Sequence, residues 1–92
     1  MPLTPLPDLI LYARPGCGLC DETRTFVIGF LEARREAGLR APNLVERDIE
    51  ADPGWERTFM SSIPVLELGD RRLELATSPA KVRRLLTDVL DA

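Results

Sequence analysis

The chain has 92 residues, the size of one small domain, and leaves no room for a second. Apolar residues make up 45% of it, which suffices for one compact core, and no run approaches the roughly 18 apolar residues that cross a membrane. The formal charge is −3, with acidic and basic residues interleaved and no histidine, which argues against nucleic-acid binding and excludes histidine bases and histidine metal ligands.

The chain begins with a proline-rich stretch, MPLTPLPD, which predicts an extended lead-in over residues 1–8 before a single domain over 9–92. The stretch has no basic flank and no long apolar run, so we expect no secretory signal and a cytoplasmic protein. The short apolar run Leu9–Ala13 is ended by Arg14-Pro15-Gly16, which predicts a buried strand followed by a turn.

The next part of the chain predicts a helix and then a second strand. From about Gly18 to Ala37 the spacing is helical, and Gly38 stands where a left-handed helix cap usually falls. The predicted buried stripe of this helix contains Cys20, Val27, Phe30 and Leu31. Residues 43–49 include three aliphatic side chains and predict the second strand.

The second half predicts a short helix, a hairpin and a last helix. Asp52-Pro53 can cap and open a helix that ends near Met60. Residues 63–68 and 71–75 predict a hairpin with its turn at 68–71. Ser78-Pro79 caps and opens the last helix. The apolar positions that recur on one face of this helix are Val82, Leu85, Leu86, Val89 and Leu90.

The resulting order is β-α-β-α-β-β-α. The first helix is long enough for a right-handed parallel crossover, and the tight turn makes the last two strands antiparallel. The prediction is therefore an α/β protein with a mixed four-stranded sheet and three helices on its two faces. With a CxxC motif at the first strand-to-helix junction, this is the thioredoxin-like arrangement.

The only cysteines, Cys17 and Cys20, carry the chemistry. Unpaired N–H groups at the start of the helix and the nearby Arg14 favour a thiolate at Cys17, and Cys20 follows one helical turn later. We therefore assign Cys17 as the attacking nucleophile and Cys20 as the resolving thiol. Asp21 and Glu22 oppose this effect from the first turn, so the sequence leaves the net direction open.

Other interpretations of individual residues stay open at this stage. The CxxC pair can also be half of a zinc site, although a tetrahedral site needs about four ligands and no further Cys or His exists. Asp48 is either a solvated aspartate at a strand end or a buried proton acceptor behind Cys20. We expect Trp55 to pack the short helix against the sheet rather than to bind ligand.

Two segments resemble those of glutaredoxins. The run from Leu11 to Cys20 is similar to their active-site entry, with a strand, a basic residue, proline and then CxxC. Ser62-Ile63-Pro64-Val65 resembles their Thr-Val-Pro-Val segment, which carries a cis-proline. Small bacterial glutaredoxin-like proteins of poorly defined function share the motifs at 14–20, 48–53 and 63–66, so the resemblance covers nearly the whole chain.

This resemblance implies a cis bond at Pro64, with the Ile63 backbone pairing with the main chain of a substrate. It also places Arg14 where glutaredoxins hold a base near a glutathione carboxylate; the alternative is a solvated surface arginine. Glutaredoxins carry Gly-Gly after the hairpin, whereas this chain has Leu75-Ala76 there. Thr77 and Ser78 could still offer hydroxyl and N–H groups to a carboxylate, or Ser78 is a plain helix cap.

The leading hypothesis is a thiol–disulfide oxidoreductase acting on a protein disulfide or a glutathione mixed disulfide. We expect no tightly bound cofactor and no metal, glutathione as a candidate co-substrate, no nucleic-acid or membrane partner, and a monomer. One alternative is a non-enzymatic module that holds a metal or iron–sulfur cluster between two chains. The other is an accessory protein of the same fold that acts through its partner surface.

Overall fold

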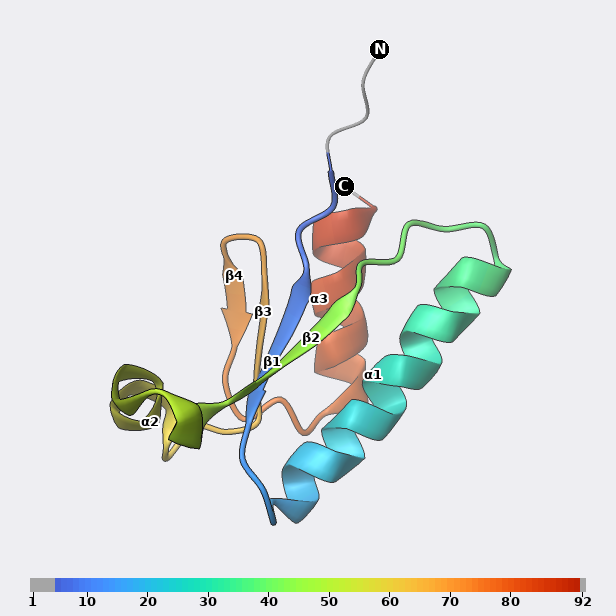
Figure 1. The fold of residues 1–92 in the computed structure, drawn as a ribbon. Coiled ribbons are helices and arrows are strands. Elements are labelled where there is room, and N and C mark those ends of the chain that lie inside the picture. The colour runs from blue at the N-terminus through green and yellow to red at the C-terminus, as the bar shows by residue number, and fades with distance from the viewer. Residues whose placement is uncertain (1–4, 92) are drawn as a thin grey trace.

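The computed structural model describes residues 5–91, so part of the predicted lead-in over 1–8 lies outside the described residues. Figure 1 shows the elements in chain order. They are β1 (Leu9–Ala13), α1 (Gly18–Glu36), β2 (Leu44–Asp48), a 3-10 turn η1 (Ile49–Ala51), α2 (Pro53–Phe59), β3 (Val65–Leu68), β4 (Arg71–Leu73) and α3 (Pro79–Leu90).

The four strands form one mixed sheet in the order β2-β1-β3-β4. β1 is parallel to β2, with Leu9 opposite Leu44, and antiparallel to β3, with Leu9 opposite Leu68. β3 and β4 form the antiparallel hairpin. These observations confirm the predicted element order and the thioredoxin-like fold. The helical crossover makes β1 and β2 parallel, and the tight turn makes β3 and β4 antiparallel.

Side chains that alternate along β1 divide the core between the two faces of the sheet. Leu9, Leu11 and Ala13 join the larger apolar cluster with α1 and α3. Tyr12 points to the other face and joins the smaller cluster, where its ring stacks on Phe59 of α2 with centroids 4.3 Å apart. The two long helices therefore cover one face and α2 covers the other (Figure 1).

The helix ends follow the local signals. Asp52 accepts hydrogen bonds from the N–H groups of Gly54 at 2.7 Å and Trp55 at 3.2 Å, which caps α2. Gly38 has φ +73°, the left-handed conformation that glycine adopts at low cost. Each predicted helix is present, with its ends within one residue of the expected positions. Among the described residues, no helix is both long and apolar enough to span a membrane.

Three strands are shorter than predicted. β3 begins at Val65 instead of residue 63, because the Ile63 N–H bonds to the Phe59 carbonyl and Pro64 has no N–H. β4 ends at Leu73 instead of residue 75, because the Leu75 N–H bonds to the Ser62 carbonyl at 2.8 Å and not to β3. Leu75 itself has φ +48°, which turns the chain out of the sheet. β2 stops at Asp48, since Ile49 enters the 3-10 turn.

Candidate active site

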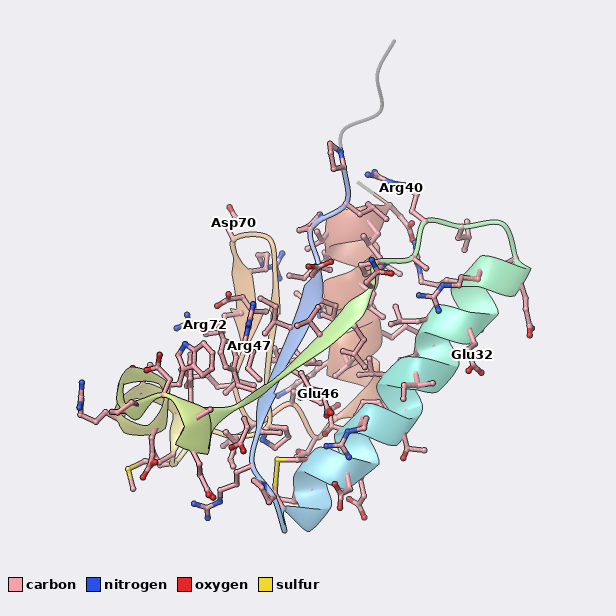
Figure 2. All side chains as sticks on the ribbon, viewed as in Figure 1. Glu32, Arg40, Glu46, Arg47, Asp70 and Arg72 are labelled. Atoms are coloured by element: carbon pink, nitrogen blue, oxygen red, sulfur yellow. A yellow bond between two sulfur atoms is a disulfide. The ribbon has the colours of Figure 1, made fainter. Side chains whose placement is uncertain are left out.

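Cys17 and Cys20 are joined by a disulfide at the start of α1, with their Cα atoms 5.2 Å apart. Figure 2 shows the sulfur–sulfur bond as a yellow stick beside the first turn of this helix. The spacing of the pair along one helical turn places the two sulfur atoms within bonding distance. The two residues can therefore alternate between a dithiol and an intramolecular disulfide.

The local backbone sets the position of Cys17. Gly16 has φ +78° and turns the chain after β1, and Cys17 then serves as the N-cap of α1 in an extended conformation. Its sulfur accepts a hydrogen bond from the Cys20 N–H at 3.1 Å. An N–H group at a helix start stabilises negative charge, so the same group would favour the Cys17 thiolate once the disulfide is reduced.

The two cysteines differ in exposure. Cys17 is half-buried, whereas Cys20 has 0% of its surface exposed. Cys20 packs in the larger apolar cluster under the first turn of α1. A disulfide of another molecule can therefore reach the sulfur of Cys17 but not that of Cys20.

An ion-pair network balances the acidic side chain nearest the cysteines in the first turn. Arg24 donates from Nη1 to Asp21 at 2.7 Å and from Nε to Glu46 of β2. The hydrogen bond to Asp21, followed by the one to Glu46, raises the pKa of Arg24 above its ordinary value. The charge of Asp21 is thus compensated locally, while Glu22 is exposed to solvent. The sequence left open whether Asp21 and Glu22 outweigh the groups that favour a thiolate at Cys17, and the ion pair with Arg24 weakens the contribution of Asp21.

Arg14 lies at the rim of a shallow cavity at the carboxyl ends of β1 and β2. The cavity has a volume of about 220 Å³. Its lining residues are Ala13, Arg14, Pro15, Asp21, Arg24, Glu46, Arg47 and Asp48. Arg14 is exposed and makes no ion pair with any described residue. Its guanidinium is accordingly available to an anionic group of a ligand.

The Ile63–Pro64 peptide bond is cis. Ile63 and Cys17 both pack against the larger apolar cluster, and Ile63 also packs against the smaller one. The Ile63 N–H already donates to the Phe59 carbonyl at 3.1 Å. The Ile63 carbonyl is therefore the group of this residue that remains for pairing with the main chain of a substrate.

A buried hydrogen-bond chain connects this loop to α1, and the sequence analysis missed it. Thr23 is fully buried and donates from Oγ1 to the Ala76 carbonyl at 2.8 Å. The Ala76 N–H donates in turn to the Pro64 carbonyl at 2.7 Å. The signal was a threonine three residues after Cys20, on the buried stripe of the predicted helix, where a polar group needs a partner.

Thr77 and Ser78 follow this chain of bonds. The Ser78 hydroxyl accepts the Lys81 N–H at 3.3 Å and so caps α3, which is the plainer of the two predicted roles. The Thr77 N–H donates to the Leu75 carbonyl at 2.7 Å. Leu75 adopts a left-handed conformation, with φ +48°, at the position where the resemblance to glutaredoxins places a glycine.

The secondary candidates have structural roles. Asp48 is exposed, and its carboxylate accepts the Glu50 N–H at 2.9 Å, so it is a solvated aspartate at the strand end and not an acceptor buried behind Cys20. Trp55 packs edge-on against Tyr12 with ring centroids 6.0 Å apart, as predicted. Within residues 5–91, no three Cys, Asp or Glu side chains gather to hold a metal ion.

Comparison with known proteins agrees with this geometry. The model of the glutaredoxin-like domain family (DUF836) matches residues 8–90. The chain belongs to this family. The glutaredoxin-like domain is also similar to the X-ray structure of a Northeast Structural Genomics target protein from X. campestris, at 28% identity and a TM-score of 0.62, over 88% of this chain and 97% of that one. No curated protein matches the chain.

Proposed function

We propose that this glutaredoxin-like protein is a thiol–disulfide oxidoreductase in which Cys17 is the nucleophile and Cys20 the resolving thiol. The observation that carries the proposal is the asymmetry of the pair. Only Cys17 is accessible, and its sulfur is also the one that accepts a backbone N–H at the helix start. The attacking nucleophile needs access to the substrate and thiolate character together, whereas the resolving thiol attacks within the molecule and needs no access to the substrate.

The reaction has two exchange steps. The Cys17 thiolate attacks one sulfur of the substrate disulfide, forms a mixed disulfide and releases the other substrate sulfur as a thiolate. The Cys20 thiolate then attacks the Cys17 sulfur and releases the second substrate thiolate, so that the substrate is reduced and the Cys17–Cys20 pair is oxidised. A thiol reductant, for which glutathione is the candidate, returns the pair to the dithiol.

The groups around the pair suggest how a substrate is held. The Ile63 carbonyl can accept a hydrogen bond from a substrate main chain, and the exposed Arg14 can meet a carboxylate. Both contacts suit a protein disulfide or a glutathione mixed disulfide. Both cysteines of the chain belong to the CxxC motif, so the sequence has none left for structural disulfides. This usage is typical of proteins in a reducing compartment, and we therefore propose that the activity takes place in the cytoplasm.

Trapping of the mixed disulfide tests the assignment. The Cys17→Ser protein is expected to lose exchange with a disulfide-linked peptide, whereas Cys20→Ser retains the first step and accumulates a covalent adduct visible by mass. The double variant is the blank for adventitious adducts. An adduct on Cys20 in the Cys17→Ser protein, with none on Cys17 in the Cys20→Ser protein, would reverse the roles. Lack of exchange by the unaltered protein would refute the activity.

A further inference from the structure

A groove between the edge strand β4 and the first turns of α3 collects basic side chains. It has a volume of about 250 Å³. Its lining residues are Arg71, Arg72, Leu73, Lys81, Arg84 and Leu85, and we call this surface the β4–α3 groove. The whole chain carries a charge of −3, so this local excess of positive charge runs against the overall balance. The interleaved charges of the sequence did not reveal it.

Three of the four basic side chains leave positive charge for a ligand. Arg72 is already engaged, since it bonds to Glu67 at 2.9 Å and lies over the Phe59 ring. Arg71 is only 3.8 Å from the Asp88 carboxylate, a loose contact between two exposed groups. Lys81 and Arg84 are exposed and make no ion pair with any described residue.

The backbone of β4 offers a second means of recognition. In the sheet order β2-β1-β3-β4 this strand has β3 on one side and, among residues 5–91, no strand on the other. Edge strands present unpaired N–H and C=O groups that can pair with an added strand. Here the cationic side chains beside that edge would repel a second copy of β4 and attract an acidic strand. Asp70, the acid of the hairpin turn, lies at the tip of the hairpin (Figure 2).

We propose that the β4–α3 groove binds an extended acidic segment of a partner protein, which adds as a strand to the free edge of β4. Carboxylates of the segment meet Lys81, Arg84 and Arg71, and an apolar side chain of the segment contacts the half-buried Leu73 between them. The groove is connected to the loop that carries the cis-proline. Leu73 lines the groove, and three residues later the Ala76 N–H donates to the Pro64 carbonyl.

A direct binding experiment tests this proposal without depending on the redox chemistry. The probe is a fluorescent, cysteine-free peptide of alternating Glu and Val, and its control is the same peptide with Gln in place of Glu. The acidic peptide is expected to bind saturably, with an affinity that falls as salt is added. The double variant Lys81→Glu/Arg84→Glu is expected to weaken binding by about tenfold or more. Arg40→Glu/Arg57→Glu changes the net charge equally, away from the groove, and is expected to stay within about twofold.

Clear outcomes would overturn the proposal. They are no saturable binding at low salt, equal binding of the Gln peptide, equal loss in the two double variants, or tighter binding of a short DNA duplex than of the acidic peptide. The rate at which the protein reduces bis(2-hydroxyethyl) disulfide, a small substrate without charge, tests the proposed function separately. This rate is expected to be unchanged in both double variants. Should the charge reversal impair folding, Lys81→Gln/Arg84→Gln provides the same comparison with a smaller change.

Discussion

Replacing Thr23 by valine removes one buried hydroxyl and little else. Valine has the same branched shape as threonine, so the packing of α1 is retained. The Ala76 carbonyl, however, loses the hydroxyl that donates to it at 2.8 Å, in a place where both residues have at most 1% of their surface exposed. No solvent can replace the lost bond without opening the contact between α1 and the segment after β4.

The expected cost follows from that burial. A buried polar group left without a partner costs about 1–3 kcal/mol, and each kcal/mol lowers the melting temperature of a domain this small by about 4–8 °C. Thr25 is the matched control, because its hydroxyl donates to the Asp21 carbonyl at 3.0 Å on the exposed face of the same helix. Thr25→Val is expected to change the free energy of unfolding by less than about 0.5 kcal/mol.

Urea unfolding of the oxidised proteins measures the difference. Thr23→Val is expected to lower the midpoint with an unchanged slope, and Thr23→Ser, which keeps the hydroxyl, is expected to recover part of the loss. Equal midpoints for the two valine variants would refute the argument that this hydrogen bond joins α1 to the loop. No recovery by serine would show that the buried methyl group, which serine lacks, contributes as much as the hydroxyl.

Three further outcomes concern charge and backbone conformation. Arg24→Gln removes the cation that pairs with Asp21, so the Cys17 thiolate is expected to form at a higher pH, as measured by thiolate absorbance. Leu75→Gly removes the steric cost of a left-handed conformation at a non-glycine residue, about 1–2 kcal/mol. It also adds an entropy cost of folding of about 0.5–1 kcal/mol, because glycine is more flexible in the unfolded chain. The urea midpoint is therefore expected to be unchanged or higher. The hydrogen bond from Arg34 holds the pKa of Asp91 below its ordinary value. The Arg34–Asp91 pair therefore stabilises the fold fully at a pH above the ordinary aspartate pKa. This stabilisation is lost as the pH falls through the lowered pKa of Asp91 in the folded protein. Asp91→Asn is therefore expected to destabilise the protein to urea at neutral pH and to have no effect once the carboxylate is protonated.

Each of these outcomes has a control of opposite or absent effect. Asp21→Asn is expected to shift thiolate formation to lower pH, and a shift in the same direction as Arg24→Gln would contradict the charge argument. Glu74→Gly, at a position without positive φ, is expected to destabilise. Asp88→Asn removes only the loose 3.8 Å contact with Arg71, and a pH dependence as large as that of Asp91→Asn would count against the Arg34 pair.

Local signals in the sequence were enough for most of the element boundaries. Asp52 before Pro53 caps α2, and Gly38 ends the turn after α1, because capping and left-handed turns depend on a few neighbouring residues. The end of β4 was wrong by two residues. It depends on bonds from Leu75 to Ser62, which are distant in sequence and leave no local pattern.

The sequence by itself determined the fold class, the CxxC pair and the start of α1 at that pair, since these depend on spacing, breakers and residue type along one stretch of chain. The helical spacing had already placed Cys20 on the buried stripe of α1, but only the tertiary structure decided that Cys17 stays partly exposed, because its exposure depends on what packs around the start of α1. It also decided the partner of Thr23 and the gathering of Arg71, Lys81 and Arg84 in one groove. The physical reason is the same in each case: contacts between distant segments arise from packing and strand pairing, and an interleaved charge pattern can still fold into a one-sided surface.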